Sequence, residues 1–395
     1  MELLKYLDTF KALPTPFYFY DMELLRETFR QAQEESRCIP LSFIHLAMKA
    51  NSHPQILQTA RDYGFGIDAV SGGEILKAIE AGIPGPNIVF AGVGKTDREI
   101  IIGLKNDILC FNVESIPEIE VINHLAGQMG KIARITLRVN PDVDAHTHKN
   151  ITTGLEENKF GIDLCDILPT IKKINSLPHL NYYGLHFHIG SQILNMDVFQ
   201  QLSIKINSLQ NALENAGITT NSINVGGGLG VDYTSPEKHP IPCFHEYFQI
   251  FYKFLKLRPH QEFHCELGRS LTAQSGALIS QVVFIKEGHV KKFAILDAGF
   301  TDLIRPALYQ ANHKIINLSS STGEDIYDVV GPICESTDVF AQDIHLPLTH
   351  RGDLMAILSA GAYGHVMASE YNCRPLIKEY TSDDLKMIKH DIYNT

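Results

Sequence analysis

The sequence lacks three features that would each assign it to a class of protein. No apolar run approaches the ~18 residues that a membrane-spanning helix requires. Basic residues are outnumbered, and the formal net charge of -11 argues against nucleic acid or an anionic membrane as the main partner. The stretch 1–21 lacks the basic and then apolar layout of a secretory signal, so we expect no such signal.

Cysteine is also scarce. The chain has 7 cysteines, an odd number, and no two of them form a CxxC pair. This usage is typical of a reduced, cytoplasmic protein without a structural zinc site, and we expect no bound metal. The 395 residues, 44% hydrophobic and 20% charged, are enough for two domains, or for one large barrel with an addition.

Strand-like and helix-like segments alternate over the first two thirds of the chain. Helical patterns at 21–35, 55–63, 74–81, 116–125, 167–174, 199–216 and 247–257 flank or separate strand-like runs at about 43–48, 66–70, 87–91, 109–113, 132–139, 183–188, 222–226 and 262–266. This order predicts a (β/α)8 TIM-type barrel. A doubly wound open sheet is the alternative, because periodicity does not show whether a sheet closes.

The pattern changes after about residue 270. Strand-like runs at 277–285, 292–296, 326–330 and 355–358 follow one another with little helical pattern between them. The run 17–20 is also strand-like and is expected to join them. The fold class is therefore α/β plus β: a barrel over 22–268, and a mainly β, sandwich- or barrel-like domain made of 1–21 and 269–395.

Lys49 follows the first apolar strand of the expected barrel, where an unpaired lysine is costly. It could extend its amine to solvent or pair with a carboxylate. It could equally form a Schiff base with a carbonyl cofactor, a reaction that a desolvated amine favours. Active sites of such barrels lie at the carboxyl ends of the strands. Other polar and glycine residues follow these ends: Asp68, His186, His188, Gly226 to Gly228, Glu266, Gly268 and Arg269.

The glycine run 226–228 follows the seventh strand of this barrel. Three glycines leave backbone N–H groups accessible and permit positive φ, which makes an anion site; a merely flexible turn is the alternative. Arg269 would add a cation, so a phosphate ester is the expected occupant. If that phosphate belongs to pyridoxal phosphate, Glu266 could keep the ring nitrogen protonated, although it could instead pair with Arg269.

Histidines leave a further alternative open. His186 and His188, two apart on a strand, would share a face, and this pair also fits a metal-dependent hydrolase. A second group, which we interpret as a polar loop, comprises Asp142, Asp144, His146 and His148.

Several motifs together resemble the diaminopimelate decarboxylases, which belong to the alanine-racemase-like, fold type III group of pyridoxal-phosphate enzymes. They are AMKAN at 47–51, DAVSGGE at 68–74, TGL at 153–155, NKFG at 158–161, GLHFHIGSQ at 184–192, the glycines from 226, RPALY at 305–309, GPICES at 331–336 and YN at 371–372. The segments 153–161 and 305–309 favour this family over ornithine or arginine decarboxylases. The resemblance covers nearly the whole chain.

The resemblance implies a role for each matching residue. The catalytic residues would be Lys49 as the Schiff-base lysine, His188 against the cofactor ring, Glu266 at the pyridine nitrogen, and Cys334, which enters from a second subunit. The cofactor, pyridoxal 5'-phosphate, would contact Lys49, Asp68, His188, Ser191, Gly226, Gly227, Gly228, Glu266, Gly268, Arg269 and Tyr371. The substrate would contact Arg269, Arg305, Tyr309, Glu335 and Tyr371.

The implied reaction is the decarboxylation of meso-2,6-diaminopimelate to L-lysine and carbon dioxide in a homodimer with shared active sites, and Cys334 or Lys49 would supply the proton. Other possibilities are a decarboxylase of ornithine, arginine or lysine, a metal hydrolase built on His186 and His188, and a non-catalytic cofactor-binding barrel. Two residues depart from the family pattern. Leu267 replaces a usual proline and is expected to loosen its turn, and Thr337 replaces a common glycine near Cys334.

Overall fold

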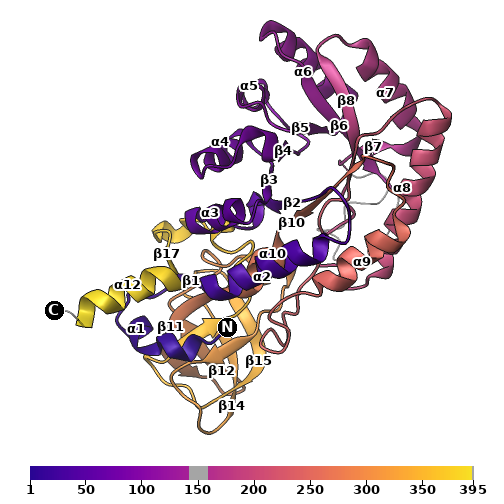
Figure 1. The fold of residues 1–395 in the computed structure, drawn as a ribbon. Coiled ribbons are helices and arrows are strands. Elements are labelled where there is room, and N and C mark those ends of the chain that lie inside the picture. Colours follow the sequence, from indigo (N-terminus) through magenta and orange to yellow (C-terminus); the bar gives the residue numbers. More distant parts are fainter. Residues whose placement is uncertain (142–158, 394–395) are drawn as a thin grey trace. The chain divides into compact units, whose positions relative to one another are not determined.

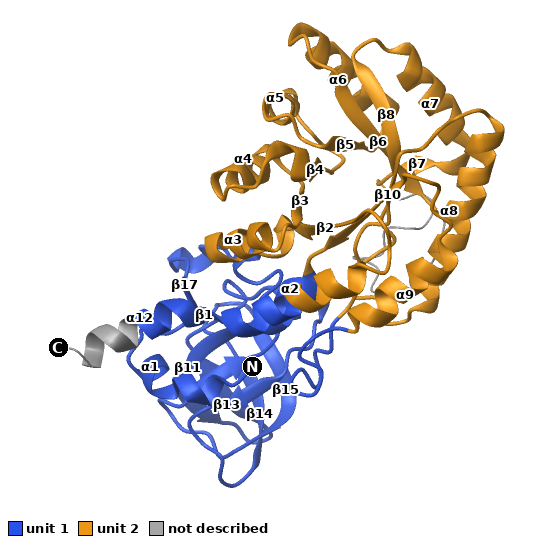
Figure 2. Cartoon of the chain, viewed as in Figure 1, with its two compact units in different colours: residues 1–28, 231–242, 269–395 blue, residues 29–230, 243–268 orange. Residues whose placement is uncertain are grey.

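The computed structural model describes residues 1–141 and 159–393 of the chain. The chain divides into two compact units, which Figure 2 colours separately. Unit 1 comprises residues 1–28, 231–242 and 269–395, and unit 2 comprises residues 29–230 and 243–268. The domain boundaries expected from the sequence, at 22–268 against 1–21 and 269–395, stay a prediction.

Unit 2 contains a closed parallel barrel. Its strands pair in the order β5-β4-β3-β2-β10-β9-β8-β6, and a further pairing of β5 with β6 closes the ring. A short strand, β7 (Ile162–Asp163), pairs in parallel with the last two residues of β6. The closure confirms the barrel and excludes the open sheet. The barrel strands are β2 (Ser42–Ala47), β3 (Gly66–Ala69), β4 (Ile88–Phe90), β5 (Cys110–Val113), β6 (Ala133–Asn140), β8 (Leu180–Phe187), β9 (Ser222–Asn224) and β10 (Glu262–Leu267).

Helices connect the barrel strands, as Figure 1 shows. Local signals fix where several of them begin. Ser71 caps α4 by accepting from the Glu74 N–H, and Thr96 with Glu99 forms a capping box on α5. Apolar positions then repeat with helical spacing, which buries one face of each helix. The helices of unit 2 are α3 (Pro54–Asp62), α4 (Gly72–Glu80), α5 (Asp97–Lys105), α6 (Ile116–Gln128), α7 (Ile167–Ser176), α8 (Asp197–Asn215) and α9 (Phe244–Phe254).

Unit 1 is mainly β. Its first strand, β1 (Phe17–Tyr20), pairs antiparallel with β11 and parallel with β17, which confirms that 17–20 joins the C-terminal strands. The remaining strands are β11 (Gly276–Glu287), β12 (Lys292–Leu296), β13 (Ile315–Asn317), β14 (Asp325–Val330), β15 (Val339–Leu346), β16 (Leu354–Ile357) and β17 (Lys378–Thr381). Its helices are α1 (Leu7–Lys11), α10 (Arg269–Thr272), α11 (Arg305–Tyr309) and α12 (Ser382–Tyr393).

One helix, α2 (Met22–Ser36), begins in unit 1 and ends in unit 2. Asp21 caps it by accepting from the N–H groups of Glu23 and Leu24, at 3.1 and 3.2 Å. None of the helices in the described ranges is long and apolar enough to cross a membrane.

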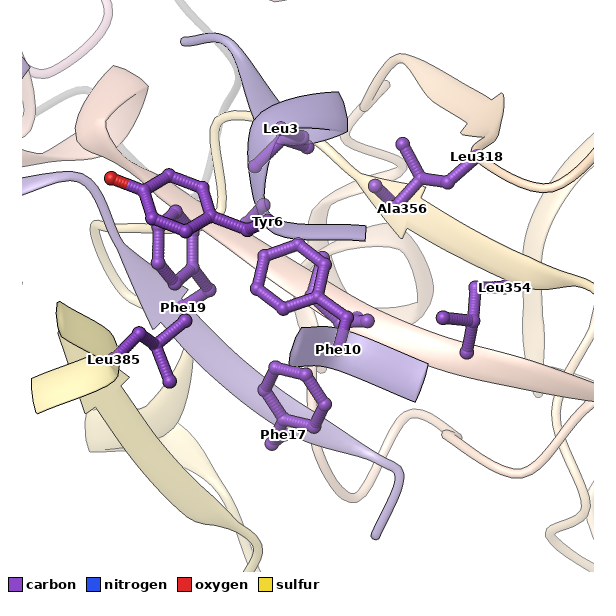
Figure 3. Packing of buried hydrophobic residues seen from close by; sticks show 11 residues of the cluster. Leu3, Tyr6, Phe10, Phe17, Phe19, Leu318, Leu354, Ala356 and Leu385 are labelled. Atoms are coloured by element: carbon purple, nitrogen blue, oxygen red, sulfur yellow. The ribbon is translucent and has the colours of Figure 1, made fainter. Parts of the chain in front are cut away.

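Aromatic side chains dominate a core of unit 1, drawn in Figure 3. Phe10 lies edge-on to Phe17 and Phe19, with ring centroids 5.5 and 5.1 Å apart, and Tyr6 lies 4.9 Å from Phe19. Leu354 and Leu385 complete this cluster from β16 and α12. The packing explains why the N-terminal strand belongs with the C-terminal part of the chain.

Candidate active site

Lys49 lies just past β2, in the 3-10 turn Met48–Ala50. Its Nζ is 3.5 Å from Oδ2 of Asp68 on β3. Burial and then the Glu266 charge raise the pKa of Asp68 to about 8, although Lys49 opposes both effects. The lysine side chain is 39% exposed and the aspartate side chain 1% exposed, so the amine stays accessible while its partner is buried. Asp68 Oδ1 has no hydrogen-bond partner within the described ranges.

Glu266, near the end of β10, is held by three side chains from three other strands. Asn112 and Asn224 donate to its Oε1 at 3.2 and 2.7 Å, and His186 Nε2 lies 3.0 Å from its Oε2. Burial alone would raise the pKa of this carboxyl, but the interaction and hydrogen bond with His186 and the charge of Lys49 hold it well below its usual value. The site therefore contains a buried carboxylate that keeps its charge.

The two histidines of the sequence pair occupy different positions. His186 is buried within β8 and contacts Glu266, while His188 follows the end of that strand and accepts from the Gly227 N–H at 3.3 Å. Burial, followed by the charges of Lys49 and Arg138, lowers the pKa of His188 well below its ordinary value. His188 is therefore a neutral ring beside the glycine turn.

The glycine turn after β9 has no room for side chains. A Cβ on Gly226 would lie 2.1 Å from the Phe187 carbonyl oxygen, and one on Gly227 would lie 2.1 Å from that of Glu266. Gly226 and Gly228 have φ of +71° and +113°, which favour glycine. The Gly226 N–H donates to Asn224 Oδ1 at 2.9 Å, and the turn presents its backbone without side chains. A turn of bare backbone suits the close approach of a phosphate, so these residues fit pyridoxal phosphate.

Two further predicted cofactor contacts lie near this region of unit 2. Gly268 comes directly after β10, and a Cβ there would approach Ala50 Cβ to 2.9 Å, next to Lys49 in the chain. Ser191 is half-buried in the segment between β8 and α8. Unit 2 thus brings together Lys49, Asp68, His188, Gly227 and Glu266 through the contacts above, with Gly226, Gly228 and Gly268 adjoining them.

Two predicted arginines lie in unit 1 and share one tyrosine ring. Arg269 donates from Nη1 to the Tyr233 hydroxyl at 2.7 Å, and its guanidinium lies 4.8 Å from the ring centre of Tyr363. Arg305 lies 5.3 Å from the Tyr233 ring centre and 6.0 Å from that of Tyr309. Both arginine side chains are buried. Unit 1 therefore holds two buried cations on aromatic faces.

A second group of predicted residues lies on two loops of unit 1. The Tyr371 hydroxyl donates to Glu335 Oε1 at 2.7 Å, and the Cys334 N–H donates to Asn372 Oδ1 at 3.3 Å. The Tyr371 ring stacks on Phe300, with centroids 6.0 Å apart. Cys334 and Glu335 are exposed, and Tyr371 is 46% exposed. These bonds tie the loop of Cys334 to the loop of Tyr371.

Sequence reasoning missed five residues that hold the predicted ones in place. Their residue types are common, so only their contacts give them a role, and Asn372 stood in the YN motif without one. The five residues are Asn112, Asn224, Tyr233, His313 and Asn372. Within the described ranges, no group of three or more His, Cys, Asp or Glu side chains could hold a metal ion.

Some sequence predictions lie outside the described residues: the TGL segment from Thr153, Asn158, and the polar loop of Asp142, Asp144, His146 and His148. Of the two departures from the family pattern, Leu267 is fully buried at the end of β10 and pairs with Leu46. Thr337 is exposed, and its carbonyl accepts from the Val339 N–H at 2.8 Å.

Known proteins resemble this chain over almost its whole length. Residues 24–273 match the family model of the pyridoxal-dependent decarboxylase, pyridoxal binding domain. A diaminopimelate decarboxylase of Bacteroides thetaiotaomicron is 55% identical over 379 residues, which cover 96% of this chain and 98% of that protein.

Solved structures agree with this relationship. A mutant diaminopimelate decarboxylase from Helicobacter pylori, complexed with L-lysine, superposes with a TM-score of 0.90 at 38% identity, covering 98% of this chain and 99% of that one. A lysine/ornithine decarboxylase from Vibrio vulnificus has a TM-score of 0.83 and covers 96% and 98% of the two chains, but at 20% identity it shows only the shared fold. The chain belongs to the diaminopimelate decarboxylases, a family of pyridoxal-dependent decarboxylases.

Proposed function

We propose that this protein removes one carboxyl group from meso-2,6-diaminopimelate with pyridoxal 5'-phosphate and so forms L-lysine and carbon dioxide. The observation that carries the proposal is Glu266, a buried carboxylate that stays charged among Asn112, Asn224 and His186. Bound pyridoxal phosphate supplies an electron sink for the bond that breaks, and this sink is strongest when its ring nitrogen is protonated. Glu266 would hold that proton in place.

The remaining residues of unit 2 have complementary roles in this proposal. Lys49 would carry the cofactor through its amine, which is accessible although its partner Asp68 is buried. Gly226, Gly227 and Gly228 would let the phosphate approach their bare backbone closely, with Ser191 and Gly268 beside them. Neutral His188 would lie flat against the ring, where a charged imidazolium would compete with the ring nitrogen for Glu266. Asp68 completes the predicted set of cofactor contacts.

Residues of unit 1 would bind the substrate. Diaminopimelate has two amino-acid ends, so the enzyme must hold one carboxylate without reacting it, and a buried guanidinium suits this task. Arg305, beside Tyr309, is our candidate for that distal carboxylate, and Arg269 contributes to cofactor and substrate binding. Glu335 and Tyr371, which are hydrogen-bonded to each other, would contact the distal amine and the cofactor.

The proposed assembly is a homodimer with shared sites. Cys334 and Glu335 lie on a loop of unit 1 and are exposed. Residues that complete the site of a neighbouring subunit must be exposed in the single chain, which supports this assembly. In this arrangement the Cys334 thiol, or the Lys49 amine, gives the proton that replaces the lost carboxyl group. We also propose a cytoplasmic location, which the seven free cysteines support.

The decisive experiment offers the purified enzyme four amino acids separately: meso-diaminopimelate, ornithine, arginine and lysine. We expect carbon dioxide release and L-lysine formation from diaminopimelate, and little turnover of the others. Lys49→Ala should lose this activity together with the visible absorbance of the bound cofactor. Lys77→Ala is the matched control. Lys77 lies on helix α4, and its amine donates to the Ser52 hydroxyl. Faster release from ornithine or arginine would refute the substrate assignment.

A further inference from the structure

Arg305 is a buried cation without a carboxylate partner in the described part of the chain. It begins the short helix α11 and is only 5% exposed. Its guanidinium faces the rings of Tyr233 and Tyr309, and burial, with the nearby Arg269, lowers its pKa. A buried charge of this kind is costly unless an anion approaches it, so the orientation of the guanidinium decides where an anion can bind.

His313 makes the one directed hydrogen bond to this guanidinium in the described ranges. Arg305 Nε donates to His313 Nε2 at 3.2 Å, and His313 Nδ1 lies 2.9 Å from the Leu358 carbonyl oxygen. A carbonyl oxygen can only accept, so Nδ1 carries the ring proton and Nε2 offers a lone pair. Burial and the Arg305 charge lower the pKa of His313 to about 3, which keeps the ring neutral. The Leu358 carbonyl thereby fixes the tautomer that Arg305 requires.

Tyr233 supports the same arrangement from another side. Its ring lies 5.0 Å from the His313 ring at an interplanar angle of 76°, and Arg269 bonds its hydroxyl. The guanidinium of Arg305 is therefore oriented by a hydrogen bond at Nε and by an aromatic ring beside it. With Nε engaged, a bidentate carboxylate can bind only through the two terminal nitrogens.

We propose that His313 is a positioning residue for substrate selection: it engages Arg305 Nε and so directs the two terminal nitrogens toward the carboxylate that the substrate keeps. This inference rests on the proposed role of Arg305 as the clamp for that carboxylate. His313 itself would touch neither substrate nor cofactor. Its hydrogen bond to Nε would determine that Arg305 binds the carboxylate through its two terminal nitrogens.

L-lysine and cadaverine, each tested as an inhibitor that competes with diaminopimelate, test the proposal because they differ by one carboxylate. The ratio of their inhibition constants therefore measures carboxylate recognition alone. His313→Asn can keep a donor toward Leu358 but loses the acceptor for Arg305, and His313→Gln can place an acceptor near the former Nε2. Arg305→Ala is the reference variant, in which the preference for L-lysine should vanish.

We expect His313→Asn to weaken L-lysine inhibition and to raise the KM for diaminopimelate, each roughly 3- to 10-fold, the worth of one hydrogen bond. Cadaverine inhibition, kcat and the visible cofactor spectrum should stay within about twofold, since none of them depends on the retained carboxylate. His313→Gln should recover most of the lysine preference. Equal loss of lysine and cadaverine binding in His313→Asn would mean that His313 acts only on folding, and would overturn the proposal.

The outcomes also separate this inference from the proposed function. If Arg305→Ala keeps the lysine preference, the clamp itself is wrongly assigned. If Arg305→Ala loses the preference and His313→Asn keeps it, only the role of His313 fails. Should His313→Asn not fold, ¹⁵N-histidine NMR of the wild-type enzyme decides, with the His313 signal identified by its loss in His313→Gln. A proton on Nε2 rather than on Nδ1 would overturn the proposal.

Discussion

At the scale of single residues, the charge of Glu266 depends on neighbours that the chain brings from distant positions. Asn112 is 154 residues away in sequence and Asn224 is 42 residues away. Both amides donate to Oε1, while Oε2 faces His186. An ionised carboxylate has about four acceptor sites, so these three contacts leave capacity for one further donor. The geometry thus satisfies most of the buried charge and keeps it available for a ligand.

The first prediction tests this charge. Glu266→Gln has nearly the same shape and can still accept from Asn112 and Asn224, but it cannot stabilise a protonated ring nitrogen. We expect kcat to fall roughly 10²- to 10³-fold, as when one preorganised electrostatic contact is removed, with a smaller change in KM. Steady-state kinetics on diaminopimelate, together with the melting temperature, measures the effect.

Glu262→Gln is the matched control, since it makes the same chemical change at the opposite end of β10. Glu262 bonds His264 and the Tyr183 hydroxyl. Its variant should keep kcat within a factor of about three. If both variants lose kcat equally, the loss reflects a general disturbance of β10, and the role given to Glu266 is wrong.

Sequence reasoning could find Lys49, Asp68 and Glu266, because each stands at or just past the end of an apolar strand, where a charged side chain is conspicuous. It could not find Asn112 or His313. Asparagine and histidine are ordinary inside proteins, and their importance here lies in one contact each: Asn112 with Glu266, 154 residues away, and His313 with Arg305, 8 residues away. Such contacts depend on tertiary packing, which periodicity does not encode.

At the scale of elements, the turn after β9 is limited by close approach of the backbone. Gly227 has ordinary φ, so its requirement for glycine is one of space: the Glu266 carbonyl oxygen occupies the place of a side chain. That oxygen belongs to β10, which pairs with β9 and β2 and cannot move easily. The same turn therefore links the proposed phosphate cradle to the strand that carries Glu266.

We predict that Gly227→Ala weakens cofactor binding by about 1–3 kcal/mol through overpacking, which corresponds to roughly 5- to 150-fold in Kd. Titration of the cofactor-free enzyme with pyridoxal phosphate, followed by its absorbance, provides the measurement. Gly94→Ala serves as control, since nothing lies within 4 Å of a Cβ there. Unchanged affinity in Gly227→Ala would show that the turn does not hold the phosphate.

Elements were predictable to different degrees. Buried parallel strands give continuous apolar runs, so all eight barrel strands could be located from the sequence. Closure could not, because the β5–β6 pairing is a tertiary contact. Strands β13, β15 and β17 escaped prediction because they are short or largely exposed, which leaves a weak hydrophobic pattern.

At the scale of the whole molecule, one buried carboxyl should make stability depend on pH. Burial raises the pKa of Asp302 from 3.8 to about 6, although the Gly299 N–H donates to it at 2.9 Å. The folded protein therefore holds this proton more tightly than the unfolded chain does. The resulting stabilisation is complete below about pH 4 and is lost as the pH rises through about 6.

Asp302→Asn should remove this pH-dependent loss, which amounts to about 1–3 kcal/mol by linkage. The difference in melting temperature between the variant and wild type should grow in favour of the variant as the pH rises from 4.5 to 7.5. The reason is that the amide still accepts from the Gly299 N–H and never ionises. Thermal unfolding at both pH values gives the comparison. Asp8→Asn, at an exposed position of the same unit, should show no such gain. A pH-independent difference for Asp302→Asn would contradict the predicted titration.

The last prediction concerns the proposed dimer. If Cys334 completes the site of the neighbouring subunit, each active site combines Lys49 of one chain with Cys334 of the other. Lys49→Ala and Cys334→Ala should then each be nearly inactive as homodimers. In a mixed dimer, one site carries both substitutions and the other carries neither, so subunit exchange should restore activity.

Random exchange sets the size of this recovery. Half of the dimers are mixed, and each has one intact site of two, so activity should reach roughly a quarter of the wild-type value. Turnover of diaminopimelate after co-refolding measures the recovery, and mass spectrometry of differently tagged subunits verifies the exchange. A mixture of Lys49→Ala with Glu266→Gln is the control: both residues lie in the barrel of one chain, so each site of the mixed dimer lacks one of them and activity should not recover. If the Cys334 mixture recovers no more activity than this control although exchange is verified, Lys49 and Cys334 lie in the same chain's site.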